Sequence, residues 1–247
     1  MICKAFGAGH DRTVILLHGG GLSWWNYRRQ AQILQSDYQV ILPVLDGHAG
    51  SDRPFTSIRD NADAVIAWID HFCGGHVSLI GGLSLGGQVL LEMLSLRRDI
   101  CRYALVESAS VIPSPLTHAL TAPAFGSSYG LIRNRSFAKL QFASLHMQQA
   151  LFEDYYRDTC LIQKADMIAF MQASTAYSLN PAISDTAAQV HVFAGEKENR
   201  RILRSADAIC GAIPGSRLTV LPGLYHGGFS LNDPQRYAQT IREIAAD

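Results

Sequence analysis

The sequence lacks several features that would point to particular classes of protein. No apolar run reaches about 18 residues, so no transmembrane helix is predicted. Lys+Arg and Asp+Glu number 21 each, and this balance gives no indication of nucleic acid or an anionic membrane as a partner. The start, Met1 to Lys4, lacks the long apolar stretch of a signal peptide, and the five cysteines are scattered and odd in number. We therefore expect a cytoplasmic protein with reduced thiols that acts on a small molecule.

Internal repeats and low-complexity tracts are also missing, and charge is sparse. The apolar fraction is 48% and the charged fraction 17% over 247 residues, which is typical of a globular chain and not of a disordered one. A chain of this length can bury one sizeable core, so it predicts a single domain over residues 1–247.

Short apolar runs alternate with amphipathic stretches along most of the chain. The runs predict strands that are buried on both faces, at 13–17, 39–45, 76–80, 103–106, 190–194 and 217–221. Between and after them, helical patterns cover 25–34, 61–72, 88–96, 202–213 and 234–245. This alternation predicts the α/β class with a doubly wound, mostly parallel sheet, in which ligands bind at the carboxyl ends of the strands.

One gap interrupts the alternation. The 82 residues from 108 to 189 are too many for a plain helical crossover, which needs about 12 to 30 residues. Prolines and glycine predict a loop over 113–128, and helices are predicted at 137–152 and 167–179. We interpret about 112–185 as a helical lid inserted into a core formed by 1–111 and 186–247.

The most informative motif is Gly82-Leu83-Ser84-Leu85-Gly86, which stands between a predicted strand and a predicted helix. A serine on so sharp a turn needs small residues two before and two after it, because larger side chains would collide. Its hydroxyl is then held above the sheet at a helix N-terminus, where negative charge is favoured. Ser84 is the candidate nucleophile.

A serine nucleophile needs a base, and the base needs an orienting acid. Where the serine stands on a turn of this kind between a strand and a helix, the acid and the base both follow it in the chain. Of the later histidines, His118 and His146 fall in the proposed lid and His191 falls within a buried strand. His226 follows the last strand at the correct edge of the sheet, and it is the candidate base.

The candidate acid is Glu198, in the loop after the strand at 190–194, from which a carboxylate can reach the next loop. Glu107 is the alternative because it ends an earlier strand at the same edge. Glu196 and Asp207 are weaker alternatives, a loop charge and a helix-surface charge.

An oxyanion hole needs two backbone N–H groups. One is assigned to Leu85, the residue after the serine. The other is assigned to Gly20, in the glycine-rich His18-Gly19-Gly20-Gly21 loop, with Gly21 as the alternative.

The order of these motifs, together with Asp46-Gly47-His48-Ala49-Gly50-Ser51 and Pro222-Gly223-Leu224-Tyr225-His226-Gly227, resembles the α/β-hydrolase superfamily over nearly the whole chain except the lid. It looks most like the small lidded esterases and carbon–carbon-bond hydrolases. The resemblance implies Ser84 as nucleophile and His226 as base. Glu198 stands where the family usually has an aspartate, one methylene shorter, and this departure keeps Glu107 open. A serine nucleophile argues against haloalkane dehalogenase or epoxide hydrolase chemistry, which would need an aspartate.

We therefore expect a carboxylesterase-like serine hydrolase that cleaves a small ester or thioester through an acyl-enzyme. Carbon–carbon bond hydrolysis, a lyase or acyl transfer on the same triad is the first alternative. A ligand-binding protein that reuses the fold without catalysis is the second. No cofactor is expected, and no metal, because the metal-like stretch from His71 to His76 lies at the opposite end of the sheet.

Two further groups of side chains have open assignments. Trp24 and Trp25 either form a wall of the substrate pocket or pack against the sheet. Methionines and phenylalanines of the lid either line an apolar acyl pocket or pack within the lid: Met147, Met167, Met171, Phe137, Phe142 and Phe170.

Overall fold

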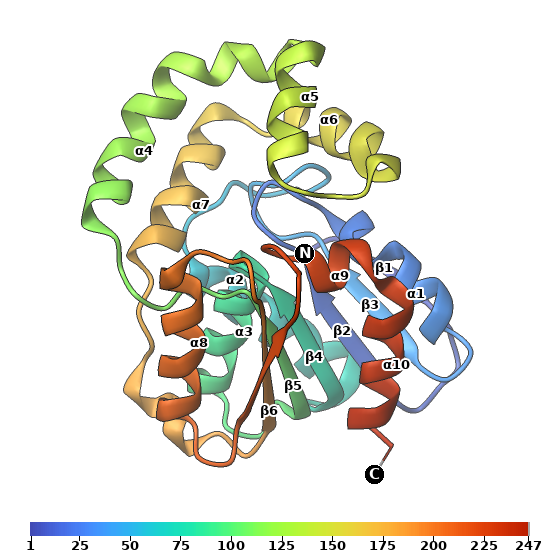
Figure 1. Ribbon diagram of the computed structural model, residues 1–247. Helices are drawn as coiled ribbons and strands as arrows, with labels where there is room; N and C mark the ends of the chain where they lie inside the picture. The colour runs from blue at the N-terminus through green and yellow to red at the C-terminus, as the bar shows by residue number, and fades with distance from the viewer. Residues whose placement is uncertain (247) are drawn as a thin grey trace.

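A computed structural model describes residues 1–246. They fold around a central β-sheet (Figure 1). Its seven strands lie in the order β1-β3-β2-β4-β5-β6-β7. All neighbouring pairs are parallel except β1 with β3, so the predicted doubly wound, mostly parallel sheet is confirmed. The strands are β1 (Cys3–Phe6), β2 (Thr13–Leu17), β3 (Gln39–Pro43), β4 (Val77–Leu83), β5 (Cys101–Glu107), β6 (Gln189–Gly195) and β7 (Arg217–Leu221).

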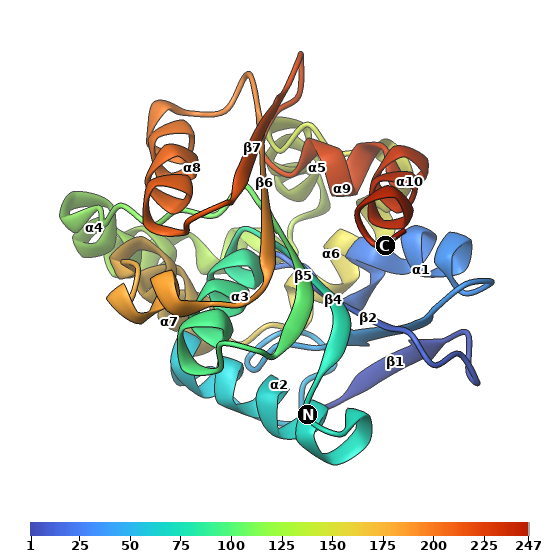
Figure 2. The same cartoon turned by 90° about the horizontal axis from the view of Figure 1, so that it is seen from below.

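Two layers of helices cover the two faces of this sheet (Figure 2). The helices outside the gap are α1 (Arg28–Leu34), α2 (Ile58–Cys73), α3 (Leu85–Leu96), α8 (Arg200–Ala212), α9 (Gly228–Asn232) and α10 (Pro234–Ile244). In β2, Ile15 and Leu17 pack with apolar residues of α2, α3 and α8, whereas Val14 and Leu16 pack with those of α1 and α10. The period-2 alternation of a strand therefore divides one continuous apolar run between two cores.

Several boundaries differ from the predictions for local reasons. The short edge strand β1 was not predicted, because its residues are half-buried or exposed and carry no apolar run. The strand β3 ends at Pro43, two residues early, since the N–H of Leu45 donates to the His18 ring at 3.0 Å instead of to a strand. The predicted helix at 25–34 begins with a 3-10 turn, η1 (Trp24–Tyr27), before α1.

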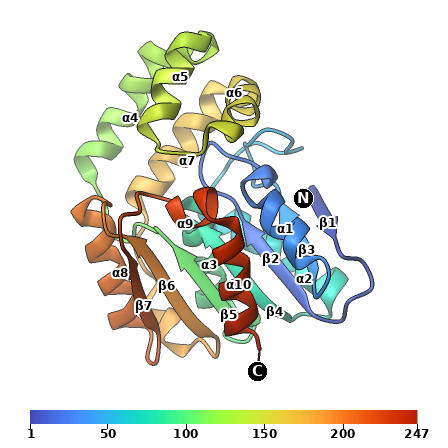
Figure 3. The ribbon, with the colours of Figure 1, turned by 45° about the vertical axis from the view of Figure 1, so that its right-hand side comes forward.

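Between β5 and β6 the chain forms a set of helices, called here the inserted helices. They are α4 (Pro115–Ser128), η2 (Tyr129–Arg133), α5 (Arg135–Ser144), η3 (Gln149–Leu151), α6 (Phe152–Leu161), α7 (Lys164–Ala176) and η4 (Pro181–Asp185). Figures 1 and 3 show α4, α5 and α6 beyond one end of the sheet. That they act as a lid stays a prediction, as does the division into core and lid.

Two predictions within the inserted helices are wrong. The expected loop over 113–128 is the helix α4, which accepts Pro115 in its first turn, where a proline has no N–H bond to lose. The expected helix over 137–152 is broken after Ser144, because His146 takes a left-handed conformation with φ 52°. No helix within residues 1–246 is both long and apolar enough to cross a bilayer.

Candidate active site

Ser84 occupies the sharp turn between β4 and α3. Its backbone has φ 52° and ψ −110°, a strained conformation for a residue with a side chain. A Cβ at Gly82 would lie 2.4 Å from the Gly86 carbonyl oxygen, and one at Gly86 would lie 2.1 Å from the Leu17 carbonyl oxygen. Both glycines are therefore required by close backbone contacts, as the motif predicts.

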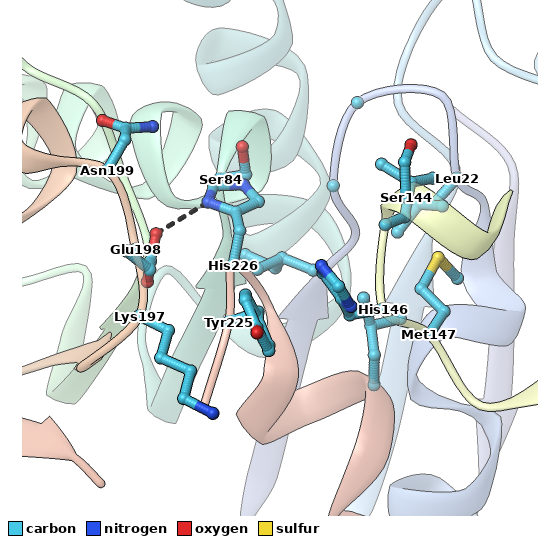
Figure 4. Close-up of a pocket in the computed structure, with 15 residues that line it drawn as sticks. Leu22, Ser84, Ser144, His146, Met147, Lys197, Glu198, Asn199, Tyr225 and His226 are labelled. Atoms are coloured by element: carbon cyan, nitrogen blue, oxygen red, sulfur yellow. Dashed lines mark hydrogen bonds and ion pairs between the residues drawn. The ribbon is translucent and has the colours of Figure 1, made fainter. Parts of the chain in front are cut away.

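Glu198 and His226 form a hydrogen-bonded pair on the two loops that follow β6 and β7. Glu198 Oε2 lies 2.8 Å from His226 Nδ1 (Figure 4). The other carboxylate oxygen, Oε1, accepts hydrogen bonds from Ser108 Oγ at 2.6 Å and from the Gly195 N–H at 2.9 Å. The Glu198 side chain is fully buried, whereas 47% of the His226 side chain is exposed.

These contacts decide the charge of Glu198. Burial by itself raises the pKa of a carboxyl group, but hydrogen bonds from His226, Ser108 and Gly195 outweigh it, and the pKa of Glu198 is lowered. The carboxylate is therefore ionised at neutral pH and holds a proton on His226 Nδ1. The remaining ring nitrogen, Nε2, is then a proton acceptor.

Ser84 and His226 line the same cavity, of about 290 Å³, together with Glu198. Figure 4 shows the three side chains among those that line it. Within residues 1–246 the Ser84 hydroxyl has no hydrogen bond to the imidazole. Such contacts are often loose in an empty site and shorten when substrate binds.

The glycine-rich loop after β2 lies against the start of α3. A Cβ at Gly20 would lie 3.7 Å from Leu85 Cβ, whereas a Cβ at Gly21, with φ +75°, would meet nothing within 4 Å. Leu85 is the first residue of α3, where backbone N–H groups have no partner within the helix. Of the two glycines, Gly20 is the one whose Cβ position packs beside Leu85, and its role in an oxyanion hole stays a prediction.

A buried histidine, His18, holds this loop in place. His18 contacts the Gly19 carbonyl oxygen through Nδ1 at 2.9 Å, and its Nε2 accepts the N–H of Leu45. Burial and the neighbouring His48 lower the pKa of His18 to about 3, so its ring is neutral at physiological pH. His18 therefore has a structural place behind the cavity.

Glu107 lies beside the cavity and not in it. Its Oε1 accepts the N–H groups of Phe229 and Ser230, both at 3.1 Å, at the start of α9. Burial raises the pKa of Glu107 to about 7. The other two candidates for the acid, Glu196 and Asp207, form no hydrogen bond with His226 within the described residues. Glu196 accepts the N–H of Gly223 at 2.8 Å, and Asp207 is exposed on α8. The structure thus brings only Glu198 of these carboxyls into hydrogen-bond contact with His226, within the part of the chain that is described.

Ser108 was missed by the sequence reasoning. It follows β5 with φ 56°, donates to Glu198 and accepts the N–H of Gly227 at 3.2 Å. One hydroxyl therefore joins the end of β5 to the loops that carry the acid and the histidine. No pattern marks this role, because a positive φ at a serine cannot be read from its neighbours in the sequence.

His146 and Tyr225 form a stack that lines the cavity. The His146 ring, from the inserted helices, stacks on Tyr225 with ring centroids 3.8 Å apart, and Lys197 Nζ lies 5.1 Å from the same tyrosine ring. All three residues line the cavity (Figure 4). His146, which the sequence reasoning set aside as part of the lid, thus lies near the candidate base.

The open assignments divide between cavity and packing. Met167, Phe170 and Met171 line a second cavity of about 320 Å³ that begins at Ser84, and Met147 lines the first cavity. Phe142 instead packs against Phe152, with ring centroids 5.3 Å apart.

One hydrogen bond decides the assignment of Trp25, while Trp24 is half-buried beneath the Lys4 and Arg28 side chains. Trp25 is 1% exposed and donates its indole N–H to Asp158 of α6 at 2.8 Å. It therefore packs in the core and attaches the inserted helices to it. Within the described residues no group of three or more His, Cys, Asp or Glu side chains is arranged to hold a metal ion.

Comparison with known proteins supplies independent information. The family model described as "Alpha/beta hydrolase family" matches residues 14–240. A curated relative, the soluble epoxide hydrolase of Corynebacterium sp. (strain C12), is 32% identical over 95 residues, which are 38% of this chain and 33% of that protein. The matched region thus spans about a third of the relative's length.

Solved structures share the fold over the whole chain. A thermophilic esterase from Thermogutta terrifontis superposes with a TM-score of 0.79 at 21% identity, covering 99% of this chain and 92% of its own. The enol-lactonase from Burkholderia xenovorans LB400 superposes with a TM-score of 0.84 at 16% identity, covering 100% and 96%. At these identities the likeness establishes the architecture.

Proposed function

Because this chain belongs to the alpha/beta hydrolase family, we propose that it is a serine hydrolase that cleaves a small ester or thioester. The observation that carries the proposal is the contact of 2.8 Å between Glu198 and His226, in the cavity that Ser84 also lines. An ionised, buried acid that fixes the tautomer of a partly exposed imidazole is the arrangement that activates a serine.

The proposed reaction begins when Ser84 Oγ attacks the carbonyl carbon and passes its proton to His226 Nε2. The N–H groups of Gly20 and Leu85 stabilise the oxyanion that forms, each by about 3 kcal/mol in the transition state. The intermediate collapses, and the imidazolium donates its proton to the departing alkoxide or thiolate. Water, deprotonated by His226, then attacks the acyl-enzyme and releases the acid and Ser84.

Glu198 stays ionised throughout and stabilises the imidazolium that forms in each half of the reaction. Ser108 holds Glu198 from the opposite side, so it acts through the acid and does not touch the substrate. The chemistry needs no cofactor or metal. A nucleophilic serine at the turn also separates this proposal from epoxide opening, the activity named for the curated relative.

The decisive experiment replaces Ser84 with alanine. We expect kcat/KM on short p-nitrophenyl esters to fall by about 10⁴-fold or more, since the nucleophile is removed. Ser95→Ala, on the helix that follows Ser84, is the matched control, because among the described residues Ser95 Oγ bonds only the Leu91 carbonyl oxygen of its own helix and should leave the rate unchanged. Turnover by Ser84→Ala near the wild-type rate would refute the proposal.

Two measurements separate the proposal from its rivals. A fluorophosphonate probe should label Ser84 in the wild type, whereas a binding protein without an activated serine would not react. A diketone assayed beside the esters tests carbon–carbon bond cleavage, and diketone turnover far above ester turnover would favour that reaction.

A further inference from the structure

Apart from Ser84 and His226, the second cavity is apolar except at Ser174 of α7 and at one wall. It extends from Ser84 into the inserted helices, where its apolar lining is Phe125, Ile132, Leu145, Met167, Phe170 and Met171. This polar wall is formed by Gln141 of α5 and by Tyr155 and Thr159 of α6. Tyr155 and Thr159 are one helical turn apart on α6, so they present neighbouring hydroxyls.

Two polar atoms of this wall have no partner in the protein. Gln141 Oε1 and Thr159 Oγ1 are buried and form no hydrogen bond within the described residues. Thr159 is 5% exposed, and its hydroxyl lies beside the Tyr155 phenol, a contact that opposes the rise in the pKa of that phenol caused by burial. A buried polar atom without a partner costs about 1–3 kcal/mol, so such atoms are rare unless a partner comes from outside the chain.

The amide nitrogen of Gln88 gives a contrast within the same fold. Gln88, on α3, donates its amide N–H groups to the carbonyl oxygens of Ser110 and Ser174 at 2.7 and 2.9 Å and so fastens α7 to the core, although its Oε1 also has no partner within the described residues. Gln141 has no such structural task within the described residues, yet it faces the cavity that begins at the candidate nucleophile. Its amide is therefore available to a ligand.

The charges around the wall limit what that ligand can be. No Lys, Arg, Asp or Glu lines this cavity, and His226 is its single titratable nitrogen base among the described residues. Burial raises the pKa of Tyr155 to about 12, so its phenol is neutral at physiological pH. A carboxylate or ammonium group would enter without a counter-ion, which is costly in an apolar cavity.

We infer that the substrate carries a neutral hydrogen-bonding group, such as a hydroxyl, ketone or amide, at the far end of an apolar chain, and that Gln141 and Thr159 bind it. The inference rests on the proposed function, because it assumes that a substrate bond is cleaved at Ser84. It assigns Gln141 and Thr159 to specificity and not to catalysis. A chain that ends in a methyl group would leave both polar atoms unpaired, and that is the loss by which a polar pocket rejects an apolar analogue.

The test compares pairs of esters of equal length, one ending in a methyl group and one in a hydroxyl. In one arm the varied chain is the acyl group of a p-nitrophenyl ester, and in the other it is the alcohol of an acetate ester, because either side of the bond can occupy the cavity. In one of the two arms we expect the wild type to favour the hydroxyl by about tenfold or more in kcat/KM.

Isosteric variants identify the residues responsible. Thr159→Val and Gln141→Leu should bring the ratio of hydroxyl to methyl substrate close to one, whereas Thr159→Ser should preserve it. Thr219→Val, an exposed threonine of β7 outside the cavity, is the control for the substitution itself. A wild-type ratio at or below one in both arms, or a ratio that both variants leave unchanged, would overturn the inference.

Failure of the proposed function would look different. In that case p-nitrophenyl acetate would not be hydrolysed and Ser84 would not react with a fluorophosphonate. If acetate is hydrolysed and Ser84 is labelled but no pair shows a preference for hydroxyl, the specificity inference alone is wrong.

Discussion

The carboxyl ends of the strands and the inserted helices enclose the same space by different means. At the strand ends, Glu198, Ser108 and His226 are joined by hydrogen bonds across three loops, which follow β6, β5 and the edge strand β7. The inserted helices instead expose large apolar side chains that do not line either cavity: Leu116, Leu120, Leu131, Leu140 and Leu161. They are attached by separate contacts such as Trp25 with Asp158 and the stack of Phe170 on His48, with ring centroids 4.4 Å apart.

The difference suggests a division of labour. The groups proposed to act in bond cleavage stand on loops at the ends of neighbouring strands, which hold them in place. The groups proposed to select a substrate stand on α5 and α6, whose contacts lie mainly within the inserted helices, so these groups can be exchanged or repacked with less cost to the fold. Three changes test whether this division holds, in decreasing order of expected effect.

The largest effect should come from the acid on the sheet. Glu198→Gln removes the charge that fixes the His226 tautomer, and we expect kcat on a p-nitrophenyl ester to fall by about 10⁴-fold. Glu107→Gln is the matched control, because Glu107 bonds the backbone of α9 and not the imidazole, and it should change kcat far less. Steady-state kinetics measures kcat for both variants. A larger loss of kcat in Glu107→Gln than in Glu198→Gln would identify Glu107 as the acid.

The same substitution should act with opposite sign in the two regions. Gly86→Ala places a Cβ 2.1 Å from the Leu17 carbonyl oxygen, and we expect it to lower the free energy of unfolding by about 3 kcal/mol or more. Gly126→Ala, in α4, meets nothing within 4 Å and should raise the stability by up to about 1 kcal/mol. Urea unfolding measures both, and equal effects would show that the inserted helices are packed as tightly as the sheet.

The third change is a change of pH, and it tests the buried carboxyl group of Glu107, which bonds α9 just after the His226 loop. The pKa of Glu107 rises from 4.5 to about 7 on folding, so between these values the native state holds a proton that the unfolded chain has released. The free energy of unfolding should therefore decrease as pH rises through this window, by up to about 3 kcal/mol. Glu107→Gln removes this contribution. Urea unfolding at pH 5 and pH 8 should show a larger loss for the wild type than for the variant, and parallel losses would contradict the assignment.

Prediction from sequence succeeded where the local pattern and the tertiary environment agree. Runs such as Thr13–Leu17 are buried on both faces, so their composition alone marks them as strands. The turn around Ser84 was equally predictable, because the close backbone contacts that require its two glycines arise within a motif of five residues. The helix α4 was misread because its prolines and its lack of charge resemble a loop, while its packing against α7 cannot be seen along the chain.

The candidate site shows the same limit. Glu107 and Glu198 each leave a parallel strand at the same edge, so sequence order leaves both within reach of His226. What separates them is direction: Glu198 turns to the imidazole, and Glu107 turns to the N–H groups of α9. The partners that orient them, among them Ser108 and Gly227, come from distant segments.

The amino-acid sequence by itself determined the α/β alternation, the strained turn at Ser84 and the loop that carries His226, because each depends on sterics or burial within a few neighbouring residues. Only the tertiary structure decided which carboxylate meets the histidine and which polar atoms are left unpaired around the cavity. Both depend on distances between segments that are remote in the chain, and no local preference of the backbone specifies those distances.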